Sequence, residues 1–376
     1  MADVHGSNDP AFDAVRDELA RTLDSGEELG AGIVVDVDGR VVVDIWGGWQ
    51  DAERQTPWGE HTVTNVWSHT KMITNLAALV LADRGLLDPY APVARYWPEF
   101  AANGKERIEV RHLLAHTSGV SGWDQPFRVE DMYDTEFATK QLAAQAPWWE
   151  PGTASGYHAQ NQGHLVGELV RRTTGRSLTA FVADEIAGPL GADFRIGAAD
   201  VDQARIAPVV PPPPLALEIP PDSVAFKTFT GPAASAEAAN TDAWRQAELG
   251  ALNGHGNARS LNRILKALAL DGTVDGVRLL SPETIALTLD EQSHGVDLVL
   301  GVPLRFGIGF ALPETQTVPY IPQGRALYWG GWGGSVTIID LDSRTTISYV
   351  MNLMGPGIIG SNRAEAYVRT AQDCLR

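Results

Sequence analysis

Hydrophobic and polar positions follow two different periods along the chain, and the change of period separates its parts. Residues 10–24 and 257–271 repeat apolar positions at the three- and four-residue spacing of an amphipathic helix. Residues 30–48 hold two β-branched runs on either side of Asp38-Gly39, which predicts a β-hairpin. Near the C-terminus, four strand-like segments precede a last helical pattern: the strands at 305–312, 325–331, 335–342 and 345–353, and the helix at 362–374.

Strand patterns lie at both ends of the chain, and mostly helical patterns lie between them. This order predicts an α+β fold, in which both termini build one antiparallel sheet of an α/β sandwich and a central helical region packs beside it. We divide the chain accordingly into residues 1–95, 96–249 and 250–376, and we expect a site in the cleft between the sheet and the helical region. The proline-rich residues 208–221 predict an extended surface connection or flap, in preference to a partner docking site.

Composition places the chain among ordinary globular proteins. It has 376 residues, 44% of them hydrophobic, and no apolar run approaches the roughly 18 residues of a membrane span. The N-terminal stretch lacks the basic and apolar segments of a secretory signal, and Cys374 is the single cysteine, so we expect a cytoplasmic protein without an internal disulfide. The net charge of −18 disfavours nucleic acid and anionic membranes as partners.

One serine–lysine pair stands where an apolar helix begins. The helical pattern runs from Met72 to near Gly85, and Ser68 and Lys71 lie just before it. Residues three apart share a helix face, so the lysine can reach the serine oxygen. A desolvated lysine is one of the few groups that can activate a serine hydroxyl, and a helix N-terminus adds partial positive charge beside it. The chain has only five lysines and only this one has a serine three residues before it, although Ser68 could also be a plain N-cap.

Two further segments carry candidate chemistry. Residues 155–159 form a glycine-bearing loop in which Tyr157 can present a phenolic oxygen to a cleft, unless it is an ordinary half-buried tyrosine. Residues 329–335, Trp-Gly-Gly-Trp-Gly-Gly-Ser, stand beside a predicted strand. Glycines in a strand let a ligand or another backbone come close, and exposed N–H groups there can bind an oxyanion, although a plain glycine-rich turn fits equally well.

Together the motifs resemble the signature of one superfamily: the class C β-lactamases, the penicillin-binding peptidases and their esterase relatives. The tryptophan–glycine–glycine version is most similar to the family VIII carboxylesterases, with the lovastatin-type acyltransferases as close relatives. The resemblance covers most of the chain and implies a β-lactamase/transpeptidase-like fold. It is carried, in chain order, by Ser68-x-x-Lys71, Tyr157-x-x and Trp329-Gly330-Gly331, and by the segments 112–119, 157–178 and 256–259.

Two motifs depart from the β-lactamases of that group. Residues 157–159 read Tyr-His-Ala instead of Tyr-x-Asn, so an amide that would help hold a β-lactam side chain is missing. Residues 329–331 read Trp-Gly-Gly instead of Lys-Thr-Gly, so an uncharged indole replaces a cation near the substrate carboxylate. These departures imply that neutral esters are favoured over penicillins and D-Ala-D-Ala peptides.

The resemblance implies a serine carboxylesterase acting on short-chain or aryl esters. Ser68 would attack the ester carbonyl, and Lys71 and Tyr157 would form the base system, with Tyr157 favoured as the direct base. The backbone N–H groups of Ser68 and Trp332 would bind the oxyanion. The substrate would lie against Trp329, Gly330 and Gly331.

Other chemistry receives little support from the sequence. His112 and His116 have the spacing of helical metal ligands, but Leu113 stands where the H-E-x-x-H motif needs glutamate, so no metal is expected. No α/β-hydrolase elbow, P-loop or dinucleotide motif occurs, so no cofactor is expected and a small ester is the indicated partner. The alternatives are a β-lactamase or D-stereospecific peptidase, an acyltransferase of the same fold, and a non-catalytic ligand-sensing homologue, and the oligomeric state stays open.

Overall fold

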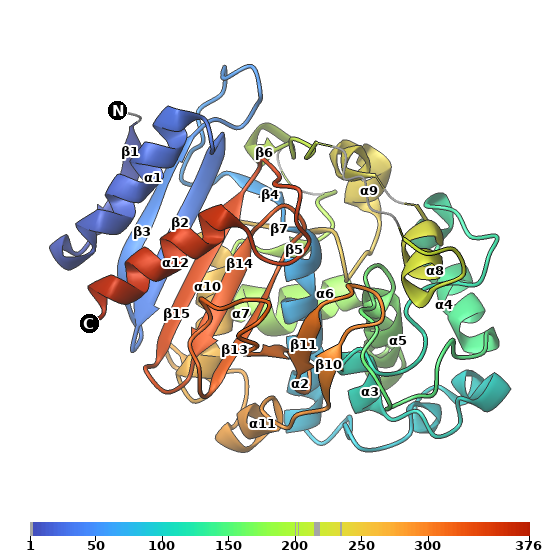
Figure 1. Cartoon of the computed structure of the whole chain (residues 1–376). Coiled ribbons are helices and arrows are strands. Elements are labelled where there is room, and N and C mark those ends of the chain that lie inside the picture. The colour runs from blue at the N-terminus through green and yellow to red at the C-terminus, as the bar shows by residue number, and fades with distance from the viewer. Residues whose placement is uncertain (1–2, 200, 202, 214–218, 234) are drawn as a thin grey trace.

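Both ends of the chain meet in one antiparallel sheet (Figure 1). The computed structural model describes residues 3–199, 201, 203–213, 219–233 and 235–376. The predicted antiparallel sheet from both termini is confirmed, because an N-terminal strand pairs with the last C-terminal strand in the middle of the sheet. Within the described residues, the sheet has nine strands in the order β1 (Val4–Asn8), β3 (Arg40–Gly48), β2 (Gly30–Val37), β15 (Thr345–Met351), β14 (Val336–Asp340), β13 (Ala326–Gly330), β12 (Ala311–Leu312), β11 (Pro303–Phe306) and β10 (Ser293–Val296).

The predicted hairpin connects β2 and β3. Asp38 and Gly39 have φ values of 50° and 85°, and Val37 pairs with Arg40 across the turn. Positive φ at both central residues is the signature of a type I′ turn, whose twist matches that of the flanking strands. The Asp-Gly pair therefore sets the register of the hairpin.

Helices cover both faces of the sheet, which becomes the middle layer of an α/β/α sandwich (Figure 1). Helix α1 (Asp13–Ser25) packs against β3 and against α12 (Asn362–Cys374) on one face. Helix α10 (Ala258–Ala269) packs against β2, β14 and β15 on the other. Its buried residues recur at helical spacing, as the pattern at 257–271 predicts: Leu261, Ile264, Leu265 and Leu268.

The helical region lies beside the strands β10 to β13 (Figure 1). Its central element is α2 (Thr70–Asp83), which is buried on nearly every side and contacts α5 (Gln162–Thr174) and α6 (Leu178–Val182). The other helices are α3 (Val110–Leu114), α4 (Thr135–Ala144), α7 (Gly188–Leu190), α8 (Val224–Thr230), α9 (Asp242–Gln246) and α11 (Pro282–Leu287). The remaining strands are β4 (Val63–Asn65), β5 (Arg195–Ile196), β6 (Ile206–Ala207) and β7 (Gly254–Gly256), which form a small sheet, and the pair β8 (Thr273–Val274) and β9 (Val277–Arg278).

The structure differs from the predicted elements in several places. The segment 305–312 is not one strand: β11 and β12 are separated by a turn in which the Gly307 N–H donates to the Phe310 carbonyl. The edge strands β1 and β10 were not predicted, because both are short and largely exposed and so lack a buried alternating face. The division into 1–95, 96–249 and 250–376 stays a prediction.

The proline-rich segment is less peripheral than predicted. Val209 is buried, and the N–H of Val210 donates to the Asn352 carbonyl while the Val210 carbonyl accepts from Met354. Residues 214–218 of this segment lie outside the described residues. The part that precedes them is thus hydrogen-bonded to the chain just after β15, because proline removes donors only at its own positions.

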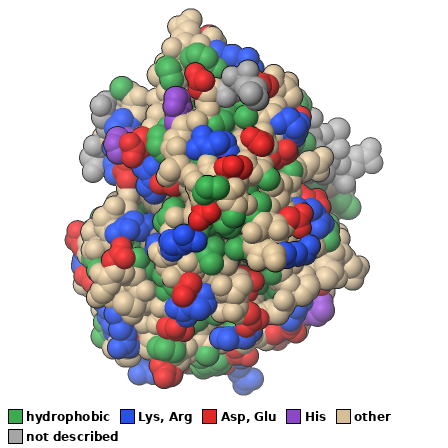
Figure 2. Space-filling view, turned by 90° about the vertical axis from the view of Figure 1, so that its left-hand side faces the viewer, with side chains coloured by type: hydrophobic (Ala, Val, Ile, Leu, Met, Phe, Trp, Pro, Cys, Tyr) green, Lys and Arg blue, Asp and Glu red, His purple; other side chains and the backbone are tan. Residues whose placement is uncertain are grey.

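The surface carries both signs of charge despite the net charge of −18. On the face shown in Figure 2, acidic and basic side chains are interspersed. Among the exposed ion pairs, Arg21 on α1 contacts Glu18 on the same helix and Glu27 just after it. None of the described helices has the length and apolar character that a membrane crossing requires.

Candidate active site

Ser68 lies in a short 3-10 turn, Trp67–His69, that leads directly into α2. Trp67 has a φ of 51°, an outlier for so bulky a residue, which must be held by its surroundings. Its buried ring is packed edge-on against Trp244 and Trp332, with ring centroids 5.5 and 5.1 Å away. The alternative interpretation of Ser68 as an N-cap is wrong, because Val66 and His69 occupy the N-cap positions of this turn and of α2.

Lys71 reaches the serine oxygen, as the three-residue spacing predicts. Its Nζ lies 3.0 Å from Ser68 Oγ, 2.8 Å from the Ala159 carbonyl oxygen and 2.9 Å from the Ala251 carbonyl oxygen. The two carbonyls can only accept hydrogen bonds. A neutral amine would give its two N–H groups to them and leave its lone pair facing the serine O–H.

The surroundings of Lys71 favour that neutral form. The side chain is buried, and desolvation lowers the pKa of the ammonium well below its ordinary value of 10.5. No carboxylate of the described residues acts on this pKa in the opposite direction. Lys71 is therefore equipped to accept a proton from Ser68 at a pH where an ordinary lysine would be charged.

Tyr157 also lies beside Ser68, and burial shifts its pKa in the opposite direction to that of Lys71. Its hydroxyl accepts a hydrogen bond from Trp329 Nε1 at 3.0 Å, and Lys71 Nζ lies 4.8 Å from its ring centroid. Burial raises the pKa of Tyr157 above its ordinary value, although hydrogen bonds to Ser68 and Trp329 lower it in part. The opposite pKa directions favour Lys71 over Tyr157 as the direct base, contrary to the expected preference, and the assignment of the base stays a prediction.

Residues outside the three sequence motifs hold Tyr157 in place. The carboxylate of Asp297, buried after β10, accepts a hydrogen bond from the Tyr157 backbone N–H at 3.1 Å, and two more from N–H groups of its own loop. The ring of His116 stacks edge-on against the Tyr157 ring, and its Nδ1 accepts from the His158 backbone N–H. Neither motif nor spacing marks Asp297, because its partner lies 140 residues away in the sequence.

The histidines near the motifs have structural contacts. His158 lies between Ser118, 2.6 Å from its Nε2, and the Gly156 carbonyl, 2.8 Å from its Nδ1. Burial lowers its pKa to about 3, so it is uncharged. His112 accepts the Glu109 N–H and completes a capping box of α3. Within the described residues, no group of three potential metal ligands occurs.

The glycines at the end of β13 lie close to backbone carbonyls, one of them just before the turn that holds Ser68. A Cβ atom on Gly331 would lie 2.2 Å from the Val66 carbonyl oxygen, and one on Gly330 would lie 2.1 Å from the Ser335 carbonyl oxygen. Only glycine allows these backbone contacts. Trp329 is buried and donates a hydrogen bond to the Tyr157 hydroxyl, and the substrate contacts of Trp329, Gly330 and Gly331 stay a prediction.

The backbone N–H groups of Ser68 and Trp332, the predicted oxyanion donors, belong to residues of one cavity. In the described part of the chain, the N–H groups of Ser68 and Trp332 donate to no backbone or side-chain acceptor. Both residues line the same cavity, and the Trp332 ring packs against that of Trp67 next to the serine. Unpaired N–H groups beside a nucleophile are suited to stabilise negative charge on a carbonyl oxygen.

The cavity at Ser68 has a volume of about 430 Å³. The described residues that line it include no aspartate, glutamate, lysine or arginine. Its walls come from the turn that holds Ser68, the loop that holds Tyr157, the end of the proline-rich segment, α8 and the loop after β15. The lining residues are Trp67, Ser68, Tyr157, Ala159, Gln160, Ile219, Phe229, Thr230, Leu252, Trp332 and Ile358.

Comparisons with known proteins agree with this geometry. The beta-lactamase family profile matches residues 15–371. The esterase/beta-lactamase LipL of Mycobacterium tuberculosis is 33% identical over 368 residues, 94% of this chain and 84% of its own, and esterase EstB of Burkholderia gladioli is 29% identical over 375 residues, 93% and 91%. The crystal structure of a family VIII carboxylesterase is 38% identical and matches 99% of this chain and 100% of that chain, with a TM-score of 0.93. The chain therefore belongs to the beta-lactamase family, as its three motifs indicated, and within it resembles the family VIII carboxylesterases.

Proposed function

We propose that the protein is a serine carboxylesterase that hydrolyses neutral esters through an acyl-enzyme on Ser68. One observation carries the proposal: Lys71 Nζ lies 3.0 Å from Ser68 Oγ, and its other two contacts are carbonyl oxygens. This arrangement gives a neutral amine one role, the removal of the serine proton. The esterase names of relatives that match over most of the chain support the same reaction.

Acylation begins when Lys71 takes the Ser68 proton and Ser68 Oγ attacks the ester carbonyl. The carbonyl oxygen becomes an oxyanion between the N–H groups of Ser68 and Trp332, each worth roughly 3–4 kcal/mol in comparable sites. The bond to the alcohol oxygen then breaks. The leaving alkoxide takes a proton from the Lys71 ammonium through the Tyr157 hydroxyl, which the hydrogen bond from Trp329 orients.

Deacylation repeats these steps with water as the nucleophile. Lys71 is neutral again after the alcohol leaves, so it can accept a proton from a water molecule that attacks the acyl carbon. The same two N–H groups bind the second oxyanion. Its collapse breaks the bond to Ser68 Oγ, returns the proton to the serine and releases the carboxylic acid.

The lining of the cavity determines the class of ester. An anionic group of the substrate would lose its water in a cavity with no cationic side chain among its described lining residues. Uncompensated burial of a carboxylate is strongly unfavourable. The site is therefore expected to favour uncharged acyl and alcohol groups, and this expectation also separates an esterase from a β-lactamase, whose substrates carry a carboxylate.

A substrate panel tests this expectation. We expect kcat/KM for methyl p-nitrophenyl glutarate, which is neutral, to exceed that for the p-nitrophenyl monoester of glutaric acid by about 100-fold or more. The two esters share the reacting carbonyl and the chain length, so the difference reports the charge. Nitrocefin and D-amino-acid amides should turn over more slowly than the neutral ester. Faster turnover of either would instead identify a β-lactamase or a D-stereospecific peptidase.

A further inference from the structure

A buried ion pair lies next to the loop 331–335, which contains the proposed oxyanion donor Trp332. The pair is on the face of the sheet that α12 covers. Arg363, in the first turn of α12, donates to Glu28 Oε2 at 2.7 Å, and the two side chains are 11% and 0% exposed. The other carboxylate oxygen of Glu28 accepts hydrogen bonds from the hydroxyls of Tyr349 and Tyr367. Both carboxylate oxygens of Glu28 therefore have hydrogen-bond partners, and the ion pair is held in place within the protein.

The place of Arg363 in its helix is unusual. A cation in the first turn of a helix faces the positive end of the helix dipole, which disfavours it. The N-terminus of α12 is already capped by Ser361, whose hydroxyl accepts from the Ala364 N–H at 3.1 Å. Stabilisation of α12 therefore does not explain Arg363, and the reason must lie in what its guanidinium contacts.

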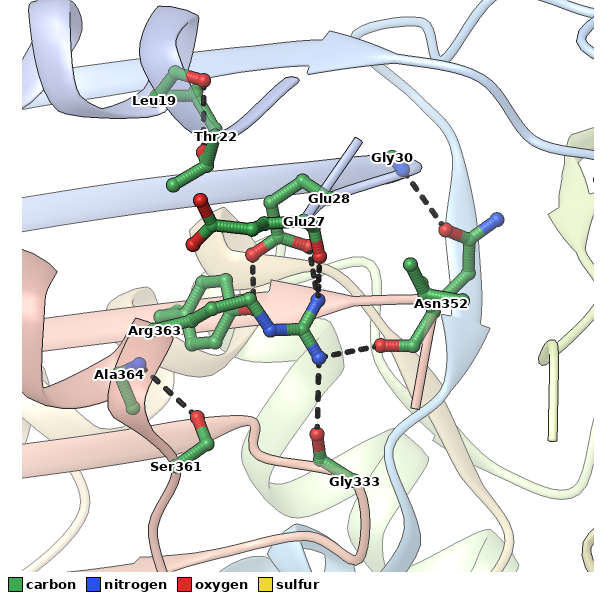
Figure 3. Close-up of polar contacts among 12 residues, drawn as sticks. Leu19, Thr22, Glu27, Glu28, Gly30, Gly333, Asn352, Ser361, Arg363 and Ala364 are labelled. Carbon is green, nitrogen blue, oxygen red and sulfur yellow. Dashed lines mark hydrogen bonds and ion pairs between the residues drawn. The ribbon is translucent and has the colours of Figure 1, made fainter. Parts of the chain in front are cut away.

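The guanidinium connects three segments of the chain (Figure 3). One nitrogen donates to Glu28 and to the Glu27 carbonyl at 2.9 Å. The other donates to the Leu353 carbonyl at 2.7 Å and lies 3.4 Å from the Gly333 carbonyl oxygen. Arginine can do this because its planar fork holds several donors in fixed directions, whereas lysine has a single compact charge.

Gly333 directly follows Trp332, whose N–H belongs to the proposed oxyanion site. The Gly333 N–H donates to the Gly357 carbonyl at 3.1 Å, and its carbonyl accepts from the Gly355 N–H at 2.8 Å. A Cβ atom on Gly333 would lie 2.8 Å from Met354 Cβ, so the two loops touch directly. The direction of the Trp332 N–H thus depends on the segment 353–357, and that segment is held by Arg363.

We propose that Arg363 is a positioning residue for the oxyanion site, which holds the loops 331–335 and 353–357 together so that the Trp332 N–H points at the reacting carbonyl. This inference rests on the proposed function, because it assigns the purpose of a contact behind the proposed site. Arg363 touches neither the substrate nor Ser68. Its rival explanation is a purely structural one, in which the pair only fastens α12 to the sheet.

The substitution Arg363→Lys separates the two explanations. Lysine keeps a positive charge for Glu28, but its one ammonium cannot occupy the positions of both guanidinium nitrogens, one at Glu28 and the other at Leu353 and Gly333. We expect kcat for p-nitrophenyl butyrate to fall at least about 10-fold with KM within about twofold, because misplacing one oxyanion donor acts on the transition state. A purely structural role would leave kcat unchanged in the folded variant, or would change kcat and KM together.

An inhibitor pair reports the oxyanion directly. An aryl trifluoromethyl ketone adds to Ser68: the Oγ–carbon bond forms, the ketone oxygen becomes an oxyanion, and Lys71 takes the proton. The matching alcohol binds without this step. We expect Arg363→Lys to weaken the ketone at least about 10-fold and the alcohol less than about twofold. Equal weakening of both, or of neither, would overturn the proposal.

Two controls keep the result interpretable. Arg259 pairs with Asp44 and Glu60 away from the cavity, so Arg259→Lys removes a comparable guanidinium group. This variant should leave unchanged both kcat for p-nitrophenyl butyrate and the ratio of ketone to alcohol affinity. If Arg363→Lys does not fold by circular dichroism, Glu28→Gln/Arg363→Gln removes both charges together, and the same inhibitor comparison decides. A wild-type protein that hydrolyses no ester would overturn the proposed function, whereas an active wild type with an unaffected Arg363→Lys variant would overturn this inference alone.

Discussion

Replacing Lys71 with methionine is expected to lower kcat/KM for p-nitrophenyl butyrate by about 10⁴-fold or more, because removal of a nucleophile's base has effects of this size in other serine hydrolases. Methionine approximates the length of the lysine side chain, so the main change is the loss of the amine. Without it, Ser68 Oγ keeps its proton, and Tyr157, whose pKa burial raises, is a poor substitute. Steady-state kinetics with circular dichroism as a folding check measures the effect.

Lys105 provides a matched control. It is another buried lysine whose Nζ donates to backbone carbonyls, those of Ala102, Ala143 and Gln145, and burial lowers its pKa to about 8. Lys105 is absent from the lining of the Ser68 cavity. Lys105→Met should therefore lower stability and leave kcat/KM of the folded protein near that of the wild type. Near-wild-type activity in Lys71→Met would rule out the proposed base.

The same amine should determine the acid limb of the pH profile. Only neutral Lys71 can accept the Ser68 proton, so activity is lost as the pH falls through the Lys71 pKa and is retained above it. Desolvation lowers that pKa well below 10.5, so kcat/KM should already be close to its plateau in a range where an ordinary lysine would be charged. A profile of kcat/KM that decreases as the pH rises through neutrality would contradict this assignment.

Removing the hydroxyl of Tyr157 should have the second largest effect. We expect Tyr157→Phe to slow acylation by about 100-fold or more, the size of a general acid–base contribution. The hydroxyl accepts from Trp329 and carries the proton proposed for the leaving alkoxide, while the ring contacts with His116 and Trp329 survive the change. Pre-steady-state release of p-nitrophenol measures the acylation step.

Tyr328 offers the corresponding control. It precedes Trp329 on β13, is 2% exposed, and its hydroxyl has no hydrogen-bond partner among the described residues. Tyr328→Phe should therefore leave the acylation rate nearly unchanged. If Tyr157→Phe also slowed acylation by only about twofold, well below a general acid–base contribution, the leaving-group proton would have to come from Lys71 alone.

Local geometry explains why part of the site could be predicted from the sequence. Ser68 and Lys71 are three residues apart at a helix start, so their contact follows from the helix itself. The Asp38-Gly39 turn was predictable for the same reason, since two residues determine it. Tyr157 and Trp329 could be connected to Ser68 only through the resemblance to a family, because no local rule brings residues from distant segments together.

The remaining features depend on tertiary packing. The carbonyls of Ala159 and Ala251 reach Lys71 from 88 and 180 residues away, and any residue type could supply them. The raised pKa of Tyr157 follows from complete burial, which its loop sequence does not reveal. The glycines at 330 and 331 were correctly associated with a close approach, because the backbone carbonyls of Val66 and Ser335 leave no room for a Cβ atom there, and their contact with substrate stays a prediction.

The central claim is that one serine, activated by Lys71, carries the acyl group. Mass spectrometry of protein quenched in acid during p-nitrophenyl butyrate turnover tests it most directly. The account predicts a single butyryl adduct on the peptide that contains Ser68 in the wild type, and none in Ser68→Ala. An adduct on another residue, or sustained turnover by Ser68→Ala, would contradict it.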